Sequence, residues 1–462
     1  MHKVRLKNRI IEVPDGTILA DILIKSGENP PHLCGGKGTC KKCLVSVNGK
    51  DELSCQYEIK SDIDVVLPKN DDIFSEIGSN ESGKITKNCC YCLDIGTTTL
   101  ALALVSLDNK EIIKVKTATN PQRAFGGDVL TRIEYCNKNA ASELQTCLIN
   151  EINKMIDDIG VSTANTMYVS GNTTMLHIFF GVDPSSIGVA PYTPIFIDSK
   201  EIKGKQIGLK KIENVISLPC ISAFVGADLV AGVNYAELPQ NNKYNLLVDL
   251  GTNAEIVIFN ENEVYCTSAA AGPCFEGANI TCGMSATDGA IYNYSLDGSY
   301  KTINNTQPKG ICGTGLIDII AVLLQKGIID KTGYMKSEEF FITKTVKITQ
   351  KDIREYQLAK SAVYSGIIAL LKEKSISFSG IENLFISGGF SAKINIENAV
   401  KTGLLSKELK DKVIVLNNSS LLGTVKYACE QNDLSVYLKN SEYIDLSTSP
   451  LFSNLYIENL EF

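Results

Sequence analysis

The sequence predicts two structural units of different fold class, a small α+β domain at the N-terminus and a larger α/β region built by duplication. Three observations lead to this division. Four cysteines lie in and after a glycine-rich loop among short apolar strands and one helix. A polar stretch follows them. The rest of the chain then presents a strand, an Asp-x-Gly-Thr turn and a second strand twice, first at Asp94 and again at Asp249.

The first 68 residues have the element order of a β-grasp domain. Residues 3–13 contain two short apolar arms around a polar turn, which predicts a β-hairpin. Thr17 is the expected cap of a short helix that closes at Gly27. Further strands are expected after the cysteine loop, at residues 44–47 and 63–67. In this order the elements resemble those of a ferredoxin, and the resemblance covers residues 1–68.

Four cysteines at C-x5-C-x2-C-x11-C spacing can enclose one small metal centre; they are Cys34, Cys40, Cys43 and Cys55. Glycines between the first two allow left-handed turns, which bring backbone N–H groups toward sulfur. A [2Fe–2S] cluster needs four thiolates and gains from such bonds, so we assign these cysteines as its ligands. Zinc is the competing interpretation, because C-x2-C also binds zinc. Zinc sites usually combine two such pairs, however, and here two of the cysteines stand alone.

The charge balance gives no reason to expect nucleic acid as a partner. The chain has 45 Lys and Arg against 52 Asp and Glu, a formal net charge of −7. The cysteine loop is the local exception, because it carries Lys37, Lys41 and Lys42. These lysines either suit an acidic partner or offset the negative charge of a cluster, and both interpretations stay open.

The segment 69–89 is expected to be a linker, because it is rich in Asn, Asp, Ser, Gly and Glu. The N-terminus shows no apolar signal region, and no apolar run approaches membrane-spanning length. We therefore expect a cytoplasmic protein without membrane association, whose fifteen cysteines are thiols or metal ligands. An anaerobic organism would suit an exposed cluster.

The two Asp-x-Gly-Thr turns indicate an internal duplication. Each stands between two apolar strands and opens a comparable length of alternating strands and helices, so we expect two lobes, 90–240 and 241–462, with the turns facing across a cleft. Turn amides and hydroxyls at these positions suit a phosphate. The pair Gly388-Gly389 after a further buried strand would let a flat purine and ribose approach the backbone. A plain strand-to-helix turn explains this pair as well.

Three more cysteines, Cys89, Cys90 and Cys92, stand where apolar residues are expected at the start of the larger region. Most simply they fill a buried strand as small hydrophobic residues. A second metal site is the alternative. His177, on a predicted helix, is expected to be a packed core histidine rather than a ligand.

In their order along the chain, these motifs resemble the ATPase superfamily of actin, heat-shock chaperones and sugar kinases, over residues 90–430. The resemblance implies a duplicated, two-lobed actin-like α/β fold that binds ATP and Mg²⁺. A triphosphate requires turn amides and hydroxyls, and Mg²⁺ is held by one or two carboxylates. By this resemblance the two phosphate loops and the adenosine turn contain Asp94, Thr97, Thr98, Asp249, Gly251, Thr252, Asn253, Gly388 and Gly389.

The two units together resemble one family, the reductive activators of corrinoid-dependent methyltransferases. The stretches that carry this resemblance are Ser170-Gly-Asn-Thr-Thr, Phe224-Val-Gly-Ala-Asp, Ala271-Gly-Pro-Cys-Phe-Glu-Gly, Gly310-Ile-Cys-Gly-Thr-Gly and Thr349-Gln-Lys-Asp-Ile-Arg-Glu. The resemblance implies a corrinoid protein as partner, a ferredoxin or flavodoxin as electron donor, and a homodimer. In one departure, the separate middle domain of longer members is expected to be reduced or absent, because little room exists between Asn88 and Asp94.

The resemblance implies ATP-dependent one-electron transfer from the cluster to inactive Co(II), which restores Co(I) for methyl transfer. Plant-type clusters have potentials near about −400 mV, whereas Co(I) is a very strong reductant, so the transfer needs a nucleotide-driven step. Glu276 and Asp228 are further candidate catalytic carboxylates beside Asp94 and Asp249, although both also suit a helix start. Two alternatives remain. One is a small-molecule kinase with a redox-sensing ferredoxin domain, and the other is a nucleotide-regulated binding protein with a structural metal.

Overall fold

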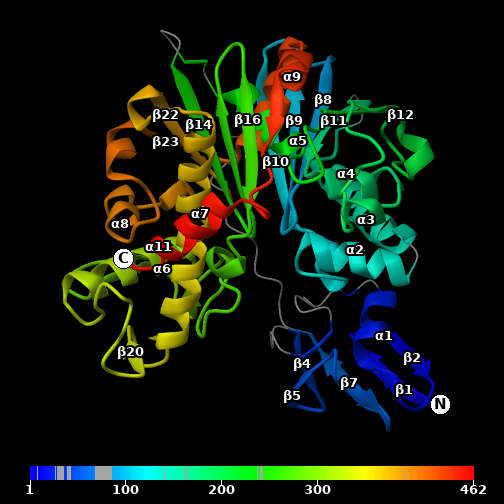
Figure 1. The fold of residues 1–462 in the computed structure, drawn as a ribbon. Coiled ribbons are helices and arrows are strands. Elements are labelled where there is room, and N and C mark those ends of the chain that lie inside the picture. The colour runs from blue at the N-terminus through cyan, green and yellow to red at the C-terminus, as the bar shows by residue number, and fades with distance from the viewer. Residues whose placement is uncertain are drawn as a thin grey trace.

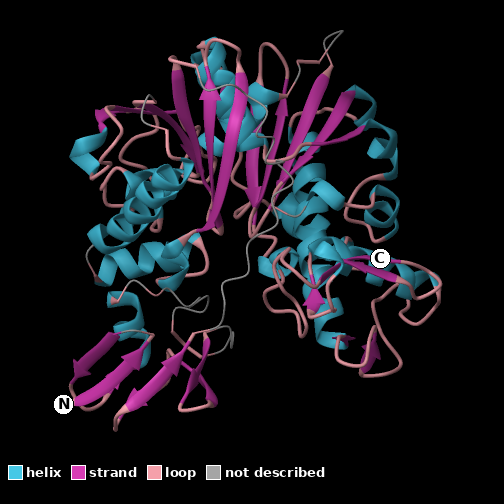
Figure 2. Ribbon diagram, turned by 180° about the vertical axis from the view of Figure 1, so that it is seen from behind, coloured by secondary structure: helices cyan, strands magenta, loops and turns pink. Residues whose placement is uncertain are grey.

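The computed structural model describes residues 1–7, 9–26, 28, 36–38, 43–67, 86–139, 141–161, 164–236, 238–239, 243–389 and 391–462. Figure 1 shows a small β-rich domain, in blue, beside a larger body in which two sheets stand next to each other. From behind, Figure 2 shows helices on the outer flank of each sheet. The two sheets belong to two lobes of similar design.

The small domain is a mixed five-stranded sheet covered by one helix. Its elements are β1 (His2–Leu6), β2 (Arg9–Val13), α1 (Leu19–Lys25), β4 (Leu44–Val47), β5 (Lys50–Leu53) and β7 (Ile63–Val66). The strand order is β2-β1-β7-β4-β5, and β1 runs parallel to β7. Leu23 of α1 packs against Val4 and Ile63 in the domain core. The predicted hairpin, helix and later strands are confirmed.

The start of α1 differs from the prediction. Thr17 does not cap the helix, because it lies with Ile18 in the short strand β3, which pairs with β6 (Glu58–Ile59). Its hydroxyl donates to the Pro14 carbonyl at 2.7 Å, and the residue at the cap position, Ile18, provides no side-chain hydrogen bond. Tertiary strand pairing therefore replaced the local cap. The expected helix end at Gly27 lies outside the described residues.

Lobe I contains a six-stranded sheet in the order β10-β9-β8-β11-β13-β12. Its strands are β8 (Cys89–Ile95), β9 (Thr99–Ser106), β10 (Glu111–Thr119), β11 (Thr166–Gly171), β12 (Glu201–Lys203) and β13 (Asn214–Ser217). Its helices are α2 (Val129–Lys138), α3 (Ala141–Ile159), α4 (Thr173–Phe179) and α5 (Ala227–Tyr235). The apolar stripe of α3 packs on one face of the sheet, against Tyr91 and Leu93.

Lobe II repeats five of these strands in a sheet of order β23-β22-β14-β15-β16-β24, but its sixth strand β24 lies beside β16, whereas β12 of lobe I lies beside β13. The strands are β14 (Tyr244–Leu250), β15 (Ala254–Phe259), β16 (Val264–Ala269), β22 (Ile381–Ser387), β23 (Val413–Val415) and β24 (Ser441–Tyr443). In each lobe the strand that carries the Asp, β8 or β14, begins a three-stranded antiparallel meander. The next strand of the same sheet along the chain, β11 or β22, pairs parallel with the Asp strand. The predicted duplication is confirmed at this level.

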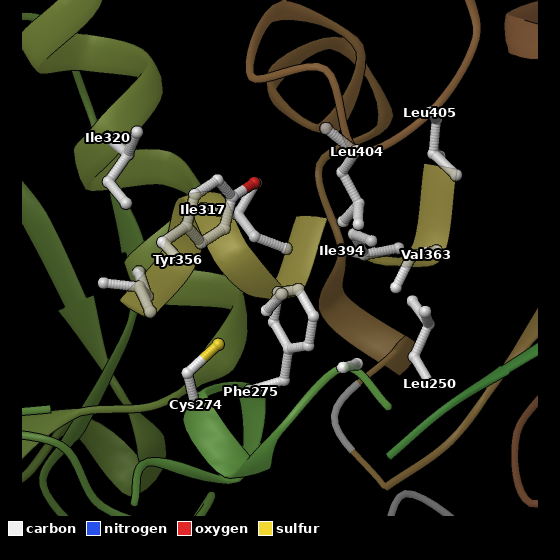
Figure 3. Packing of buried hydrophobic residues seen from close by; sticks show 14 of the residues in the cluster. Leu250, Cys274, Phe275, Ile317, Ile320, Tyr356, Val363, Ile394, Leu404 and Leu405 are labelled. Atoms are coloured by element: carbon white, nitrogen blue, oxygen red, sulfur yellow. The ribbon is translucent and has the colours of Figure 1, made fainter. Parts of the chain in front are cut away.

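The helices and minor sheets of lobe II complete the body. They are β17 (Ala290–Tyr294), β18 (Tyr300–Thr302), β19 (Gly310–Ile311), α6 (Gly313–Gln325), β20 (Glu339–Phe341), β21 (Lys347–Thr349), α7 (Gln350–Glu373), α8 (Ile396–Lys401), α9 (Ser419–Glu430), α10 (Ser435–Lys439) and α11 (Pro450–Glu458). Figure 3 shows the core that α6 and α7 share, with Phe275 directed toward Tyr356 and Leu250 nearby. The Phe275 and Tyr356 rings meet edge to face, 5.9 Å apart.

Two helices, α5 and α9, lie between the sheets of the two lobes. They touch closely, because a Cβ added at Gly423 of α9 would stand 1.8 Å from the Ala231 carbonyl oxygen of α5. Although α9 comes late in the chain, its Leu421 packs against Cys90 and Cys92 on the inner face of the lobe I sheet. Both lobes therefore pack against the helix pair α5 and α9, directly behind the two Asp-Gly-Thr turns.

Candidate functional site

The two turns open into one cleft of about 1060 Å³ between the lobes. Every residue predicted for the nucleotide site lines it: Asp94, Thr97, Thr98, Asp228, Asp249, Gly251, Thr252, Asn253, Glu276, Gly388 and Gly389. The volume lies at the upper end of the range for small-molecule sites, about 300–1,000 Å³. The structure thus brings together residues from distant parts of the sequence. Asp94 and Gly389, the first and the last of them, are 295 positions apart.

Asp94 and Asp249 occupy equivalent places, near the ends of β8 and β14. A serine orients each carboxylate. The Ser420 hydroxyl of α9 donates to Asp94 Oδ1 at 2.8 Å, and the Ser387 hydroxyl of β22 donates to Asp249 Oδ2 at 2.5 Å. Each serine comes from an element distant in sequence from its Asp, so no local motif indicates these pairs. One oxygen of each carboxylate is fixed in this way.

The first Asp-Gly-Thr turn is tight, and a hydrogen bond from a neighbouring element holds it. A Cβ at Gly96 would stand 2.6 Å from the Thr99 carbonyl oxygen, so only glycine fits there. The Asn172 side chain donates to Thr97 Oγ1 at 3.1 Å, and the same side chain caps α4 through the Met175 N–H. Asn172 belongs to the stretch Ser170-Gly-Asn-Thr-Thr, and this contact joins that stretch to the first Asp-Gly-Thr turn.

Glu276 joins the two turns. Its Oε2 accepts a hydrogen bond from the Thr98 hydroxyl at 2.8 Å, and its Oε1 accepts from the Thr252 N–H at 3.1 Å and the Thr252 hydroxyl at 3.0 Å. The residue ends the short 3₁₀ turn Pro273–Glu276, whose Cys274 and Phe275 are anchored in the core shown in Figure 3. The carboxylate therefore holds the donors that the turns would offer to a phosphate.

The carboxylates in the cleft raise one another's pKa. Burial raises the pKa of Asp94 to about 6, and the charge of Asp249 adds to this effect. Burial, with the charges of Asp249 and Asp94, raises the pKa of Asp228 to about 7. Burial also raises the pKa of Asp249, against the hydrogen bond from Ser387. A bound cation would relieve this crowding.

Glu255 is a further carboxylate of the cleft that was not predicted from the sequence. It lies on β15 and lines the cleft, and burial raises its pKa well above the ordinary value, with further effects from Asp249 and Asp228. A single carboxylate within the otherwise apolar strand Ala254–Phe259 was the available signal. The duplicated unit has Leu100 at the corresponding place, so the two halves of the cleft are not chemically equivalent.

The two glycines of the predicted adenosine turn differ in their surroundings. Gly388 has a φ of 114°, and a Cβ there would stand 2.2 Å from the Leu250 carbonyl oxygen, so this glycine is required by close packing on β14. A Cβ at Gly389 would meet no protein atom within 4 Å. The first glycine thus positions the turn, and the second presents bare backbone to the cleft.

The predicted metal site is described in part. Cys34 and Cys40 lie outside the described residues, whereas Cys43 and Cys55 are buried free thiols whose sulfurs lie 3.3 Å apart. A tetrahedral metal bonded to two thiolates at about 2.3 Å would hold them roughly 3.8 Å apart. No group of three His, Cys, Asp or Glu side chains that could hold a metal ion occurs among the described residues. The four-cysteine site stays a prediction.

The surroundings of these two sulfurs suit a thiolate ligand pair. The Gly38 N–H and the Gln56 side chain donate toward Cys55, the latter at 3.7 Å from the sulfur. A Cβ at Gly38 would stand 2.9 Å from the Gln56 side chain, and the backbone there has a φ of 72°. Burial and the neighbouring Cys43 thiol raise the pKa of Cys55 to about 11. A bound cation would reverse that shift.

Two simpler interpretations are confirmed. His177 is fully buried, with Nδ1 at 2.7 Å from the Thr173 carbonyl oxygen and its ring stacked on Phe196. Cys89, Cys90 and Cys92 are buried residues of β8. The first faces the core under α3, and the other two face α9. All three act as core residues of this strand.

Two family models match consecutive parts of the chain. A model of the RACo middle region matches residues 89–241, and a model of the C-terminal domain of RACo, the ASKHA domain, matches residues 243–462. The matched middle region is the part of the chain that carries the first Asp-Gly-Thr turn. The expectation that a further, separate middle domain is reduced or absent ahead of Asp94 stays a prediction.

Relatives match over nearly the whole chain. The corrinoid activation enzyme RamQ of Eubacterium limosum is 28% identical in an alignment 579 positions long, which covers 98% of this chain and 97% of that protein. The [Co(II) methylated amine-specific corrinoid protein] reductase of Methanosarcina barkeri is 25% identical, over 80% of this chain and 76% of that protein. The solved structure of a reductive activator for corrinoid, iron–sulfur protein is 26% identical with a TM-score of 0.74, and the match covers 100% of this chain and 98% of that chain.

No helix in the described part of the chain has both the length and the apolar character needed to span a membrane.

Proposed function

Because this chain belongs to the RACo family of reductive activators of corrinoid proteins, we propose that it uses ATP to drive one electron onto the cobalt of a corrinoid protein. The transfer restores Co(I) from inactive Co(II). The observation that carries the proposal is the combination, in one chain, of a paired-thiol site and a cleft that gathers both Asp-Gly-Thr turns. The protein is therefore an enzymatic activator.

The cleft supplies the groups that a nucleotide triphosphate needs. Asp94 and Asp249 present carboxylate oxygens on opposite sides, where one or two carboxylates and the phosphates can complete a Mg²⁺ site. The turns offer the hydroxyls of Thr97, Thr98 and Thr252 to the phosphates, and Gly389 leaves room for the nucleoside beside bare backbone. Because these groups come from both lobes, a bound triphosphate favours a closed cleft.

Glu276 competes with the phosphates for the same donors. A triphosphate that binds Thr98 and Thr252 must displace its carboxylate, which holds both residues in the structure. Hydrolysis then needs a group that accepts a proton from the attacking water. Asp228 suits that role, because its pKa is raised to about 7, mainly by burial, and an effective general base has a pKa near the working pH.

The small domain fits a [2Fe–2S] centre through Cys43 and Cys55, with Cys34 and Cys40 completing the set. The fit rests on the 3.3 Å separation of the two described sulfurs and on the Gly38 N–H directed at one of them. When bound, such a centre supplies single electrons at low potential. The N–H and amide donors around Cys55 stabilise a thiolate, and the buried position limits water at the sulfur pair.

The partner is a corrinoid protein, as the names of the relatives indicate. We further propose a ferredoxin or flavodoxin as electron donor, since the proposed centre accepts one electron at a time. Homodimer formation through the larger body follows from the family resemblance.

The experiment that tests this function follows cobalt directly. The anaerobically purified and reconstituted chain is mixed with a corrinoid protein and a chemical reductant, and the Co(I) absorption band is recorded with ATP, with ADP and without nucleotide. The proposal predicts that Co(I) accumulates with ATP only. Co(I) formation at the same rate and extent in all three mixtures would contradict it.

A further inference from the structure

Arg132 of α2 lies fully buried behind the first Asp-Gly-Thr turn. Its Nη2 donates to the Thr97 carbonyl at 2.5 Å, its Nε to the Gly126 carbonyl at 3.0 Å and its Nη1 to Gln122 Oε1 at 3.2 Å. These acceptors are all neutral. Burial lowers the pKa of Arg132 to about 9, so the group still carries its charge at neutral pH. Burying this cation is costly, and the charges of Asp128 and Glu276 offset part of that cost, so Arg132 is linked electrostatically both to the start of α2 and to the cleft.

The same helix reaches from the cleft to the small domain. Asp128, Val129, Leu130 and Thr131, at its start, line the cleft, and the Asp128 carboxylate caps it through the Thr131 N–H at 2.8 Å. The helix has 10 residues, which span about 15 Å at 1.5 Å per residue. A helix of this length moves as one rigid element, so a shift at the first turn is carried to its far end.

The far end of α2 contacts the small domain, and Figure 1 shows α1 directly beside it. Ile24 of α1 packs against the apolar cluster to which α2 and α3 contribute. The hydrogen bond to Lys138 lowers the pKa of Glu134 on α2, and the positive charge of Lys37 in the small domain adds to this effect. Through Ile24 and Lys37, the described part of the small domain therefore faces α2 and the neighbouring α3.

We propose that α2 couples ATP at the first turn to the docking of the small domain, and that Arg132 is the positioning residue of this coupling. The inference rests on the proposed function only in requiring that ATP binds the cleft. Because coupling is reciprocal, weakening the docking changes ATP affinity by the same factor by which ATP changes the docking. Nucleotide binding thereby controls when the small domain leaves α2 and becomes accessible to a corrinoid protein.

A double-mutant cycle on the full-length chain tests this coupling with fluorescent mant-ATP as the probe. Ile24→Glu weakens the docking face, and Ile10→Glu is the matched control, because Ile10 is 64% exposed on another face of the same domain. Each is measured alone and combined with Arg132→Lys, which keeps the charge but loses the planar fork that holds several acceptors. Hydrogen exchange of residues 19–25 with and without mant-ATP is measured on the wild-type chain and on Arg132→Lys.

Ile24→Glu is expected to change the mant-ATP dissociation constant about fivefold or more, and Ile10→Glu less than about 1.5-fold. In the Arg132→Lys background the effect of Ile24→Glu disappears, and mant-ATP no longer alters exchange in residues 19–25. An effect of Ile24→Glu below about twofold, or of equal size in both backgrounds, would overturn the inference. If Arg132→Lys does not fold, the wild-type chain alone decides: hydrogen exchange in residues 19–25 that is the same with and without mant-ATP would overturn the inference. Failure of the wild-type chain to bind mant-ATP would contradict the proposed function itself.

Discussion

The hydroxyl of Thr98 in lobe I donates a hydrogen bond to the carboxylate of Glu276 in lobe II, with 2.8 Å between the two oxygens. The same carboxylate accepts two hydrogen bonds from Thr252. One side chain thus holds both phosphate turns through donors that a nucleotide would need. Opening this contact is a defined cost of ATP binding, and it can be measured.

Replacing Glu276 by Gln is expected to tighten ATP binding. The variant removes the negative charge that competes with the phosphates for Thr98 and Thr252, while its size is nearly unchanged. A charge-assisted hydrogen bond is stronger than a neutral one by about 1 kcal/mol, so mant-ATP affinity should rise about fivefold. Glu261→Gln, in the exposed turn between β15 and β16, is the control and should have no effect. Unchanged or weaker binding by Glu276→Gln would argue against the competition.

Thr252→Ala and Asp249→Asn should separate the nucleotide step from the iron–sulfur chemistry. Both positions line the cleft, far in sequence from the cysteines. We expect visible colour and iron content to match the wild-type protein, while stimulation of cobalt reduction by ATP falls at least about tenfold. Loss of colour in either variant would show that the cleft supports the metal site directly, contrary to this account.

Cys55→Ser and Cys40→Ser should have the opposite effect. Each removes one of four predicted thiolate ligands, so iron and labile sulfide content and cobalt reduction should be lost, whereas mant-ATP affinity should stay within about twofold of wild type. Cys147→Ser, a partly exposed thiol on α3, is the matched control. Normal cobalt reduction by the Cys40 or Cys55 variant would rule out the proposed electron route. A zinc-loaded, colourless wild-type protein would do so as well.

ATP turnover should depend on pH through Asp228. Its pKa is raised to about 7, chiefly by burial, and only the ionised carboxylate accepts a proton, so turnover should rise as the pH passes through about 7 and then level off. Asp228→Asn should lower turnover and remove this step from the profile. A wild-type profile that is flat from pH 6 to 8 would exclude Asp228 as the base.

The same shift has a consequence for stability. A pKa raised above the ordinary value means that the folded chain holds the proton more tightly than the unfolded chain. Without nucleotide, stability should therefore decline as the pH rises from about 4 toward and through 7. Asp228→Asn should raise the melting temperature more at pH 8 than at pH 4, which a thermal scan at the two pH values checks.

Local sequence patterns predicted the elements whose defining residues lie close together in the chain. The hairpin of residues 3–13 and both strand–Asp-Gly-Thr–strand units follow from periodicity and turn chemistry within short windows. Thr17 shows the limit of this reasoning. A threonine before a helix predicts a cap, but pairing of β3 with β6 places it in a strand. The distant residues 58 and 59 decided its conformation.

The residues that complete the cleft could not be predicted in the same way. Ser420 reaches Asp94 across 326 positions, because α9 crosses back to the lobe I sheet. Arg132 supports the first turn from a helix whose sequence resembles an ordinary surface helix, with no motif to single it out. Such contacts depend on how the elements pack, and a single sequence does not encode that packing in any short window.

The central claim, that ATP raises the driving force for cobalt reduction, is tested most directly at a fixed solution potential. The fraction of Co(I) in a corrinoid protein is measured spectroscopically against a redox buffer, in the presence of the wild-type chain with ATP, with ADP or without nucleotide. A shift of 100 mV in the effective reduction potential of cobalt corresponds to about 2.3 kcal/mol for one electron. The account predicts a higher Co(I) fraction with ATP than with ADP at the same potential. Equal Co(I) fractions under all three conditions would contradict it.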